Sequence, residues 1–203
     1  MTTADKITSL RLILAPLFFI VYLLPSLFPA GFVKGSQWTV PVLWLLFLCS
    51  EITDLIDGKV ARKRGEVSDF GKLYDPFADI LVRITYFLCF VVTGVLPAVF
   101  FLVVLYREFG ILFIRALMMK KGVVMGARKG GKLKAVCYMA AGVAALLAVS
   151  AERLGAPGIL FTVFRTIALI IFIISVVISV ISFGDYFLLY QKTGSGENKQ
   201  GNP

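Results

Sequence analysis

The sequence predicts an all-α integral membrane protein with six transmembrane helices. Of its 203 residues, 59% are hydrophobic and only 16% are charged, whereas a soluble domain usually carries about 25% charged residues. Residues 12–33, 84–106, 135–151 and 166–184 contain no charged side chain, and about 20 apolar residues suffice for a helix to cross a bilayer. The short alternating segments of a membrane β-barrel are not seen.

The six spans are expected over residues 10–30, 38–62, 73–94, 96–119, 132–152 and 158–189. Residues 29–35 and 155–158 break the helical pattern, and Gly94 with Pro97 divides an overlong apolar run. The first span follows a mixed polar start, so we expect an uncleaved helix and not a signal peptide. We expect residues 1–190 to form one membrane catalytic domain, and the Gly-, Lys- and Asn-rich residues 191–203 to form a disordered cytoplasmic tail.

The basic residues predict the orientation of these spans. One set of helix ends carries Lys6, Arg11, Lys192, Lys199 and the basic residues within 59–72 and 120–134, whereas the other set carries little beyond Lys34 and Arg153. The positive-inside rule places the first set, with both termini, in the cytoplasm. We therefore expect a multi-pass protein of the cell (inner or plasma) membrane. The net charge of +9 then reflects topology, and we expect no nucleic-acid partner.

Two residue types limit the possible chemistry. The chain has no histidine, which excludes imidazole bases, His-metal sites and Ser-His-Asp triads. Cys49, Cys89 and Cys137 lie in separate apolar stretches without paired spacing, so we expect small buried hydrophobic side chains, not metal ligands or disulfides.

The most informative segment, residues 54–79, joins the expected second and third helices through a short basic loop. Asp54 and Asp57 are three residues apart, and Asp75 and Asp79 are four apart, so each pair lies on one face of its helix. The short loop makes these helices antiparallel neighbours. We expect their carboxylates to meet at the cytoplasmic membrane face.

Four carboxylates at one place in a membrane protein need a cation. A charge at membrane depth costs about 2.5–3.5 kcal/mol, and the carboxylates would also repel one another. Oxygen ligands without His or Cys favour Mg²⁺ or Mn²⁺, and a two-metal site with ions about 4 Å apart suits phosphoryl chemistry. We interpret Asp54, Asp57, Asp75 and Asp79 as ligands of two divalent cations. The alternative is a solvated helix face near the membrane surface.

Small residues accompany the carboxylates. Gly58 and Ala61 leave a shallow strip through which a phosphorylated group can approach the backbone, and Arg62 can pair with a phosphate in bidentate fashion. Close packing of transmembrane helices explains Gly58 and Ala61 equally well.

These residues form the pattern D-x2-D-G-x2-A-R-x8-G-x3-D-x3-D, in which Gly71 is the second glycine. The pattern resembles that of the CDP-alcohol phosphotransferases. The resemblance implies that family's six-helix fold, a homodimer, and two divalent ions held by the four aspartates. It also implies a CDP moiety bound along Asp54, Gly58, Ala61, Arg62 and Gly71, with Asp79 as the general base that takes the proton of the acceptor hydroxyl.

A second polar set lies in residues 107–134. Arg107 and Arg115 share one face of an apolar helix, too deep for anchoring, and Glu108 is expected to pair with one of them. With the basic residues that open the fifth helix, they would receive an anionic acceptor; the full predicted set is Arg107, Arg115, Lys129, Lys132 and Lys134. Positive-inside anchoring is the alternative, and it is favoured for Lys120 and Lys121.

Further short segments resemble one branch of the family, the phosphatidylglycerophosphate synthases. These segments are Ile7-Thr8 with Arg11, Arg107-Glu108 with Arg115, Gly131-Lys132-Leu133-Lys134, and Gly184-Asp185-Tyr186-Phe187. The resemblance implies transfer of a phosphatidyl group from CDP-diacylglycerol to glycerol 3-phosphate, with release of CMP, in phospholipid biosynthesis.

Other functions remain open at this point. Within the family, the alternatives are a different acceptor (inositol phosphate, serine or phosphatidylglycerol) or a CDP-choline or CDP-ethanolamine donor. An ion transporter would use the aspartates as a transport site, but transporters place such groups near the midplane on broken helices, often in repeated halves. Here the carboxylates fall at the end of one helix pair, and no second half repeats them.

Overall fold

The computed structural model describes residues 3–27, 33–64, 69–120, 122 and 129–197; side chains are described except at residues 3–7, 27, 33–35, 55–64, 69–70, 72, 129–132 and 192–197. Its α-helices are α1 (Thr3–Leu23), α2 (Thr39–Arg64), α3 (Asp69–Val92), α4 (Ala98–Lys120), α5 (Lys129–Arg153) and α6 (Gly158–Glu197). Two short 3-10 helices, Leu24–Leu27 and Val33–Trp38, lie between α1 and α2. The described residues are all-helical apart from turns, which confirms the all-α prediction.

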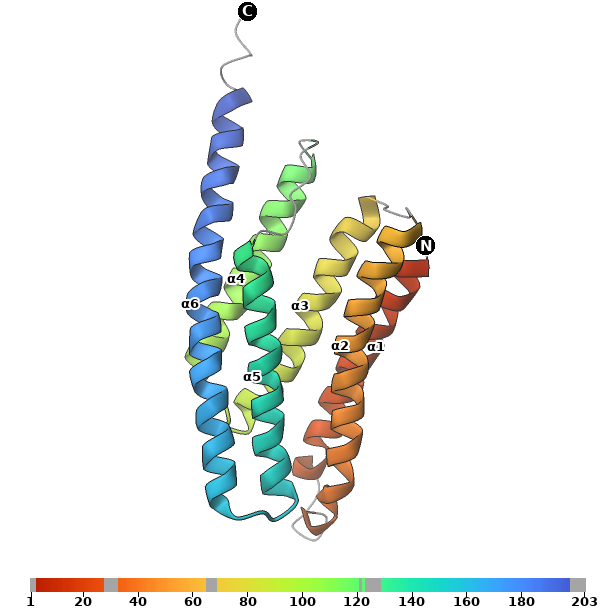
Figure 1. The fold of residues 1–203 in the computed structure, drawn as a ribbon, viewed down its shortest axis with the longest axis vertical. Coiled ribbons are helices and arrows are strands. Elements are labelled where there is room, and N and C mark those ends of the chain that lie inside the picture. Colours follow the sequence, from red (N-terminus) through yellow and green to blue (C-terminus); the bar gives the residue numbers. More distant parts are fainter. Residues whose placement is uncertain (1–2, 28–32, 65–68, 121, 123–128, 198–203) are drawn as a thin grey trace, which may run out of the picture.

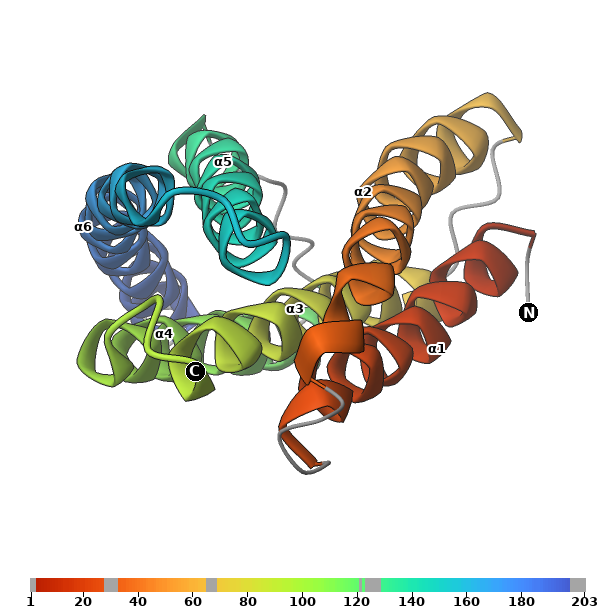
Figure 2. The ribbon, with the colours of Figure 1, turned by 90° about the horizontal axis from the view of Figure 1, so that it is seen from below.

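The helices form two groups (Figures 1 and 2). Helix α1 packs against α2 and α3, helix α6 packs against α5 and α4, and α3 joins the groups through α4 and α5. The core between them is rich in aromatic side chains: Tyr86 packs edge-on against Phe47 and Phe87, with ring centroids 5.3 and 4.9 Å apart. Phe87 also contacts Phe172 of α6, so a continuous apolar core holds the groups together.

Glycines end helices at two of the predicted breaks. Gly94 has a φ of 73° in the turn between α3 and α4, and Gly155 has a φ of 71° between α5 and α6. Residues with side chains rarely adopt this conformation, so both turns depend on glycine. The predicted break at residues 29–35 lies partly outside the described residues, and its described part is the 3-10 helix that ends at Trp38.

Helices α1 and α6 extend furthest beyond the predicted spans. Helix α1 begins at Thr3 and helix α6 continues to Glu197, because hydropathy marks the apolar part of a helix and not its polar ends. Residues 191–197, which composition assigns to the tail, are thus helical, whereas 198–203 lie outside the described residues.

Within the described residues, three segments are long and apolar enough to cross a membrane: Thr8–Ser26, Leu133–Arg153 and Gly158–Gln191. They lie on α1 with the start of the following 3-10 helix, on α5 and on α6. Helices α3 and α4 are of similar length, but charged residues such as Asp79 and Arg83 of α3 and Arg107 and Glu108 of α4 lie inside the helix and not only at its ends. The side chains of the last ten residues of α2 are not among those described. Helices α2, α3 and α4 are those on which the sequence places the candidate site, so their charges need a partner inside the protein.

Candidate active site

The carboxylates predicted to meet do so where their side chains are described. Asp54 of α2 and Asp75 and Asp79 of α3 each offer an oxygen, and these oxygens all lie within 4.8 Å of one another. The three side chains are 28%, 43% and 21% exposed. Asp57 belongs to α2 one turn beyond Asp54, but its side chain lies outside the described part. We refer to Asp54, Asp75 and Asp79 as the aspartate cluster.

The aspartate cluster is held by arginines from two helices. Arg11 of α1 is buried, and its guanidinium donates to Asp54 from Nη1 at 2.8 Å. It also forms ion pairs with Asp75 and Asp79. Arg83 of α3 lies 3.7 Å from the other oxygen of Asp54. These contacts partly neutralise carboxylates that would otherwise repel one another at the end of a helix pair.

The donor atoms of the cluster fit a hard divalent cation. All three described ligands are carboxylate oxygens from two adjacent helices, the ligand type that Mg²⁺ and Mn²⁺ prefer. A cationic guanidinium already lies among these oxygens, which shows that the arrangement stabilises positive charge. The residues present are therefore suited to such an ion.

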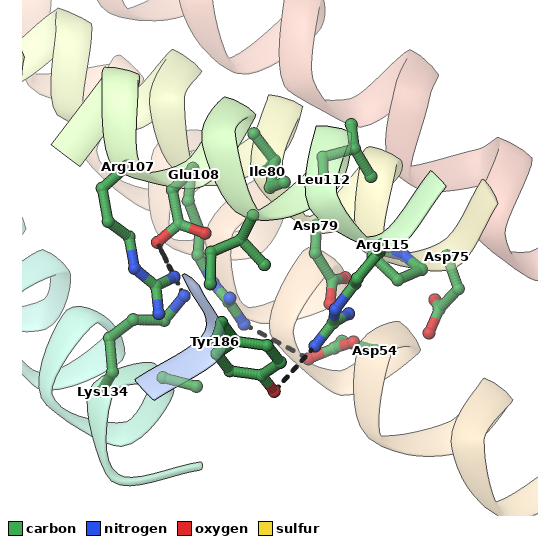
Figure 3. Close-up of a pocket in the computed structure, with 14 residues that line it drawn as sticks. Asp54, Asp75, Asp79, Ile80, Arg107, Glu108, Leu112, Arg115, Lys134 and Tyr186 are labelled. Atoms are coloured by element: carbon green, nitrogen blue, oxygen red, sulfur yellow. Dashed lines mark hydrogen bonds and ion pairs between the residues drawn. The ribbon is translucent and has the colours of Figure 1, made fainter. Parts of the chain in front are cut away.

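A pocket of about 300 Å³ opens beside the cluster (Figure 3). One of its sides is acidic and carries Asp54, Asp75 and Asp79. On the opposite side Figure 3 shows Arg107, Glu108 and Lys134. Helices α2, α3, α4, α5 and α6 all contribute to the lining, so the pocket lies between the two helix groups.

The basic side of the pocket is organised by Glu108. Its carboxylate Oε1 accepts hydrogen bonds from Lys134 Nζ at 2.6 Å and from Arg107 Nη1 at 3.0 Å. Arg107 also donates from Nε to the Ser179 carbonyl of α6 at 2.9 Å. The sequence predicted that Glu108 pairs with Arg107 or Arg115. The partner is Arg107, and Lys134 is a second partner that the helical spacing did not indicate.

Arg115 lies two turns from Arg107 on α4 and also lines the pocket. Its Nη2 is 3.4 Å from the Tyr186 hydroxyl oxygen of α6, and its guanidinium lies over the Tyr186 ring at 5.7 Å from the centroid. Tyr186 is buried, so its ring and hydroxyl restrict the positions of the Arg115 side chain. Arg107, Arg115 and Lys134, three of the five predicted acceptor-binding residues, thus line one pocket.

The remaining predicted site residues are placed only by their backbone. Gly58, Ala61 and Arg62 lie on the last turns of α2, and Lys129 and Lys132 lie at the start of α5. Their side chains lie outside the described part. Gly71, on the first turn of α3, is half-buried. Their roles stay predictions.

Sequence reasoning gave no site role to Arg11, Arg83 and Tyr186. The position of Arg83 beside the aspartates could have been predicted, because Arg83 follows Asp75 and Asp79 at intervals of four residues on one face of α3. Arg11 and Tyr186 belonged to short family-like segments, but they reach the site from α1 and α6, and spacing along the chain does not reveal contacts between such distant helices.

Comparison with known proteins agrees with this geometry. Residues 1–181 match the model of the CDP-alcohol phosphatidyltransferase family. The chain belongs to this family. A relative from Treponema pallidum (strain Nichols), named CDP-diacylglycerol–glycerol-3-phosphate 3-phosphatidyltransferase, is 38% identical over 193 residues, which are 92% of this chain and 88% of the relative.

Two further members have related names. A Bacillus subtilis (strain 168) protein named in the same way is 35% identical over 134 residues, which are 64% of this chain and 68% of that protein. A Mycobacterium tuberculosis (strain ATCC 25618 / H37Rv) protein named probable phosphatidylglycerophosphate synthase is 33% identical over 131 residues, which are 64% of this chain and 59% of that protein. The chain is thus an enzyme of a phosphatidyltransferase family.

Proposed function

We propose that this enzyme transfers the phosphatidyl group of CDP-diacylglycerol to glycerol 3-phosphate and releases CMP. The observation that carries the proposal is the single pocket that joins the aspartate cluster to Arg107, Arg115 and Lys134. The acidic side suits a phosphoryl-transfer centre, and the basic side suits a phosphorylated acceptor. The names of the relatives from Treponema pallidum and Bacillus subtilis support the same donor and acceptor.

The carboxylates of Asp54, Asp57, Asp75 and Asp79 would hold two divalent cations, Mg²⁺ or Mn²⁺. Such ions, when bound, neutralise a diphosphate and the charge that develops on the leaving group. The described carboxylates support this role because they converge from two helices.

The donor would lie along the end of α2. The family pattern assigns the CDP moiety to Asp54, Gly58, Ala61, Arg62 and Gly71, and Asp54 is the member that also lines the pocket. With the nucleotide on α2, the lipid-side phosphorus would point into the pocket toward the acceptor.

The acceptor phosphate would bind to the basic side. Arg107, Arg115 and Lys134 present guanidinium and ammonium groups to the pocket, and charge-assisted hydrogen bonds to phosphate are the strong class of such contacts. Lys129 and Lys132 lie near Lys134 at the start of α5 and would add to the positive field. The acceptor hydroxyl would then point toward the aspartate cluster.

Asp79 would act as the general base. It lines the pocket between Asp75 and Arg83 on α3. Its carboxylate would take the proton of the acceptor hydroxyl as that oxygen bonds to the lipid-side phosphorus, while the bond from this phosphorus to the CMP oxygen breaks. The buried cations Arg107 and Lys134 keep the acceptor in place during this exchange.

We further propose a homodimer in the cell membrane with six spans per chain and the active site at the cytoplasmic face. The three apolar helices and the distribution of basic residues support the membrane topology, whereas the homodimer rests on the family resemblance alone. On this view α2, α3 and α4 also cross the bilayer and turn their charged residues toward the pocket. Residues 1–190 would be the catalytic domain and 191–203 the cytoplasmic tail.

A panel of acceptors tests the proposed reaction. Purified protein in detergent is given labelled CDP-diacylglycerol, Mg²⁺ and one of glycerol 3-phosphate, inositol phosphate, serine or phosphatidylglycerol, and the lipid product and CMP are measured. We expect CMP and phosphatidylglycerophosphate only with glycerol 3-phosphate. Turnover with serine or phosphatidylglycerol in place of glycerol 3-phosphate would refute the assignment of the acceptor but not the family reaction.

A further inference from the structure

Among the cationic side chains of the site that the structure describes, Arg11 is the least exposed. It lies on α1, which packs against both α2 and α3, and it is 1% exposed. Its Nη1 contacts Oδ1 of Asp54 and of Asp79, and its Nη2 contacts Oδ1 of Asp75. One guanidinium thus joins all three members of the aspartate cluster, which come from two different helices.

The oxygens that Arg11 contacts belong to the carboxylates that would hold the divalent ions. A carboxylate shared between a guanidinium and a metal ion binds each less strongly, and the two cations also repel each other. Arg11 and a divalent ion are therefore competitors for the aspartate cluster.

The two cations reach the cluster from different sides. Arg11, with Asp54 and Asp79, lines a small cavity of about 10 Å³. The large pocket is lined by the same two aspartates but not by Arg11. An ion arriving from the large pocket meets the carboxylates first, and the guanidinium lies behind them on the α1 side.

We propose that Arg11 is an internal counter-ion that neutralises the aspartate cluster and gives way when divalent cations bind. This inference rests on the proposed divalent-cation site. Without any cation, three neighbouring carboxylates inside a helix bundle would carry a large electrostatic cost. Arg11 removes part of this cost.

The proposal predicts opposite effects of Arg11 on stability and on metal affinity. Loss of Arg11 should destabilise the protein in EDTA, because the carboxylates lose their counter-ion. It should also strengthen metal binding, because no guanidinium has to be displaced. A residue that only braced the fold would lower stability without raising metal affinity, so the second effect distinguishes the two roles.

The test compares full-length wild type, Arg11→Met and Arg11→Lys in detergent, with Arg165→Met as control because Arg165 is exposed on α6. The Mn²⁺ dissociation constant is measured by EPR of free Mn²⁺, and the unfolding temperature is measured in EDTA and in Mn²⁺. We expect Arg11→Met to bind Mn²⁺ roughly tenfold more tightly than wild type, within the usual range for coupled binding. We also expect it to unfold at a lower temperature in EDTA and to gain more from Mn²⁺. The control should match wild type.

Unchanged or weaker Mn²⁺ binding by Arg11→Met would overturn the proposal. If Arg11→Met does not fold, Mn²⁺ binding by Arg11→Lys is compared with wild type in its place, and unchanged or weaker binding would again overturn the proposal. Lysine keeps the charge but cannot bridge three carboxylates. A wild type that binds no Mn²⁺ would refute the divalent-cation site itself, and the counter-ion role with it. A wild type that binds Mn²⁺ as tightly as Arg11→Met would refute the counter-ion role alone.

Discussion

The charged side chains that are buried within the described part of the chain occur in compensated groups. Arg11 and Arg83 pair with the aspartate cluster, and Glu108 joins Arg107 and Lys134. Burying a charge without a partner costs free energy. Removing one member of such a group leaves the remaining charges buried and unpaired, which lowers the stability of the protein. The contributions of single residues therefore depend on which partners remain.

Glu108→Gln should destabilise the protein because Lys134 and Arg107 would keep their charges and lose their shared acceptor. Breaking a buried ion pair in this way typically costs about 3–5 kcal/mol. Thermal unfolding in detergent measures the loss. The double variant Glu108→Gln with Lys134→Met removes the unpaired ammonium and should recover part of the stability. No recovery would show that Glu108 stabilises the bundle by some other contact.

Arg115→Gln should raise KM for glycerol 3-phosphate and leave KM for CDP-diacylglycerol nearly unchanged, because we propose that the Arg115 guanidinium, which lines the pocket, binds the acceptor phosphate. One charge-assisted hydrogen bond corresponds to about 1.5–3 kcal/mol, or roughly tenfold to a hundredfold in KM. Steady-state kinetics with each substrate varied in turn checks this. Arg165→Gln is the matched control, since Arg165 is exposed on α6. Equal increases for both substrates would contradict a specific role at the acceptor.

The individual residues of the site were predictable to different degrees. Asp54, Asp75 and Asp79 could be assigned from spacing, because helical periodicity and a short connection fix their mutual position. The pairing of Lys134 with Glu108 could not, because it depends on how α5 packs beside α4. Arg11 and Tyr186 likewise reach the site only through tertiary packing.

At the scale of the helices, hydropathy identified all six elements but not their ends. The polar starts and ends of α1 and α6 are helical without being apolar. The turns at Gly94 and Gly155 were predicted correctly because glycine marks them in the sequence. Helices α3 and α4 carry site charges inside their apolar stretches, and this explains why composition alone does not class them as membrane spans.

Gly142 fixes the approach of α5 to α2. A Cβ at this position would lie 3.1 Å from two ring atoms of Phe47 and 3.5 Å from Tyr86. Both rings belong to the aromatic core, so they have little room to move. Gly142→Leu should therefore lower stability by about 1–3 kcal/mol, as overpacked cores do.

The unfolding temperature in detergent measures this effect. Gly158→Ala is the control, because no atom lies within 4 Å of a Cβ at Gly158. A Gly142→Leu variant as stable as wild type would contradict the close α5–α2 packing.

At the scale of the whole molecule, the site lies toward one end of the bundle. The end of α2, the start of α3, the end of α4, the start of α5 and the C-terminal part of α6 all lie toward the same end in Figure 1. The sequence predicted this arrangement from its basic residues, and we propose that this end faces the cytoplasm. Arg153, at the other end, donates to Thr39 and to the Tyr22 carbonyl.

Labelling of single cysteines tests the orientation. In a background without Cys49, Cys89 and Cys137, cysteine replaces either Lys120, at the end of α4, or Glu152, near the end of α5; both positions are exposed. A membrane-impermeant maleimide added to intact cells should label Glu152→Cys and spare Lys120→Cys until the membrane is opened. The reverse pattern would place the site on the outer face.

The central claim is that carboxylates of two neighbouring helices hold divalent cations for phosphatidyl transfer. The most direct measurement is the rate of CMP release from CDP-diacylglycerol by Asp75→Asn and Asp79→Asn, with Mn²⁺ binding measured in parallel. Glu152→Gln is the control, an exposed carboxylate near the other end of α5. We expect both Asn variants to lose at least about a hundredfold in rate, consistent with the loss of electrostatic stabilisation, and to bind Mn²⁺ more weakly, while the control behaves as wild type. Wild-type rates and Mn²⁺ binding in both Asn variants would contradict the claim.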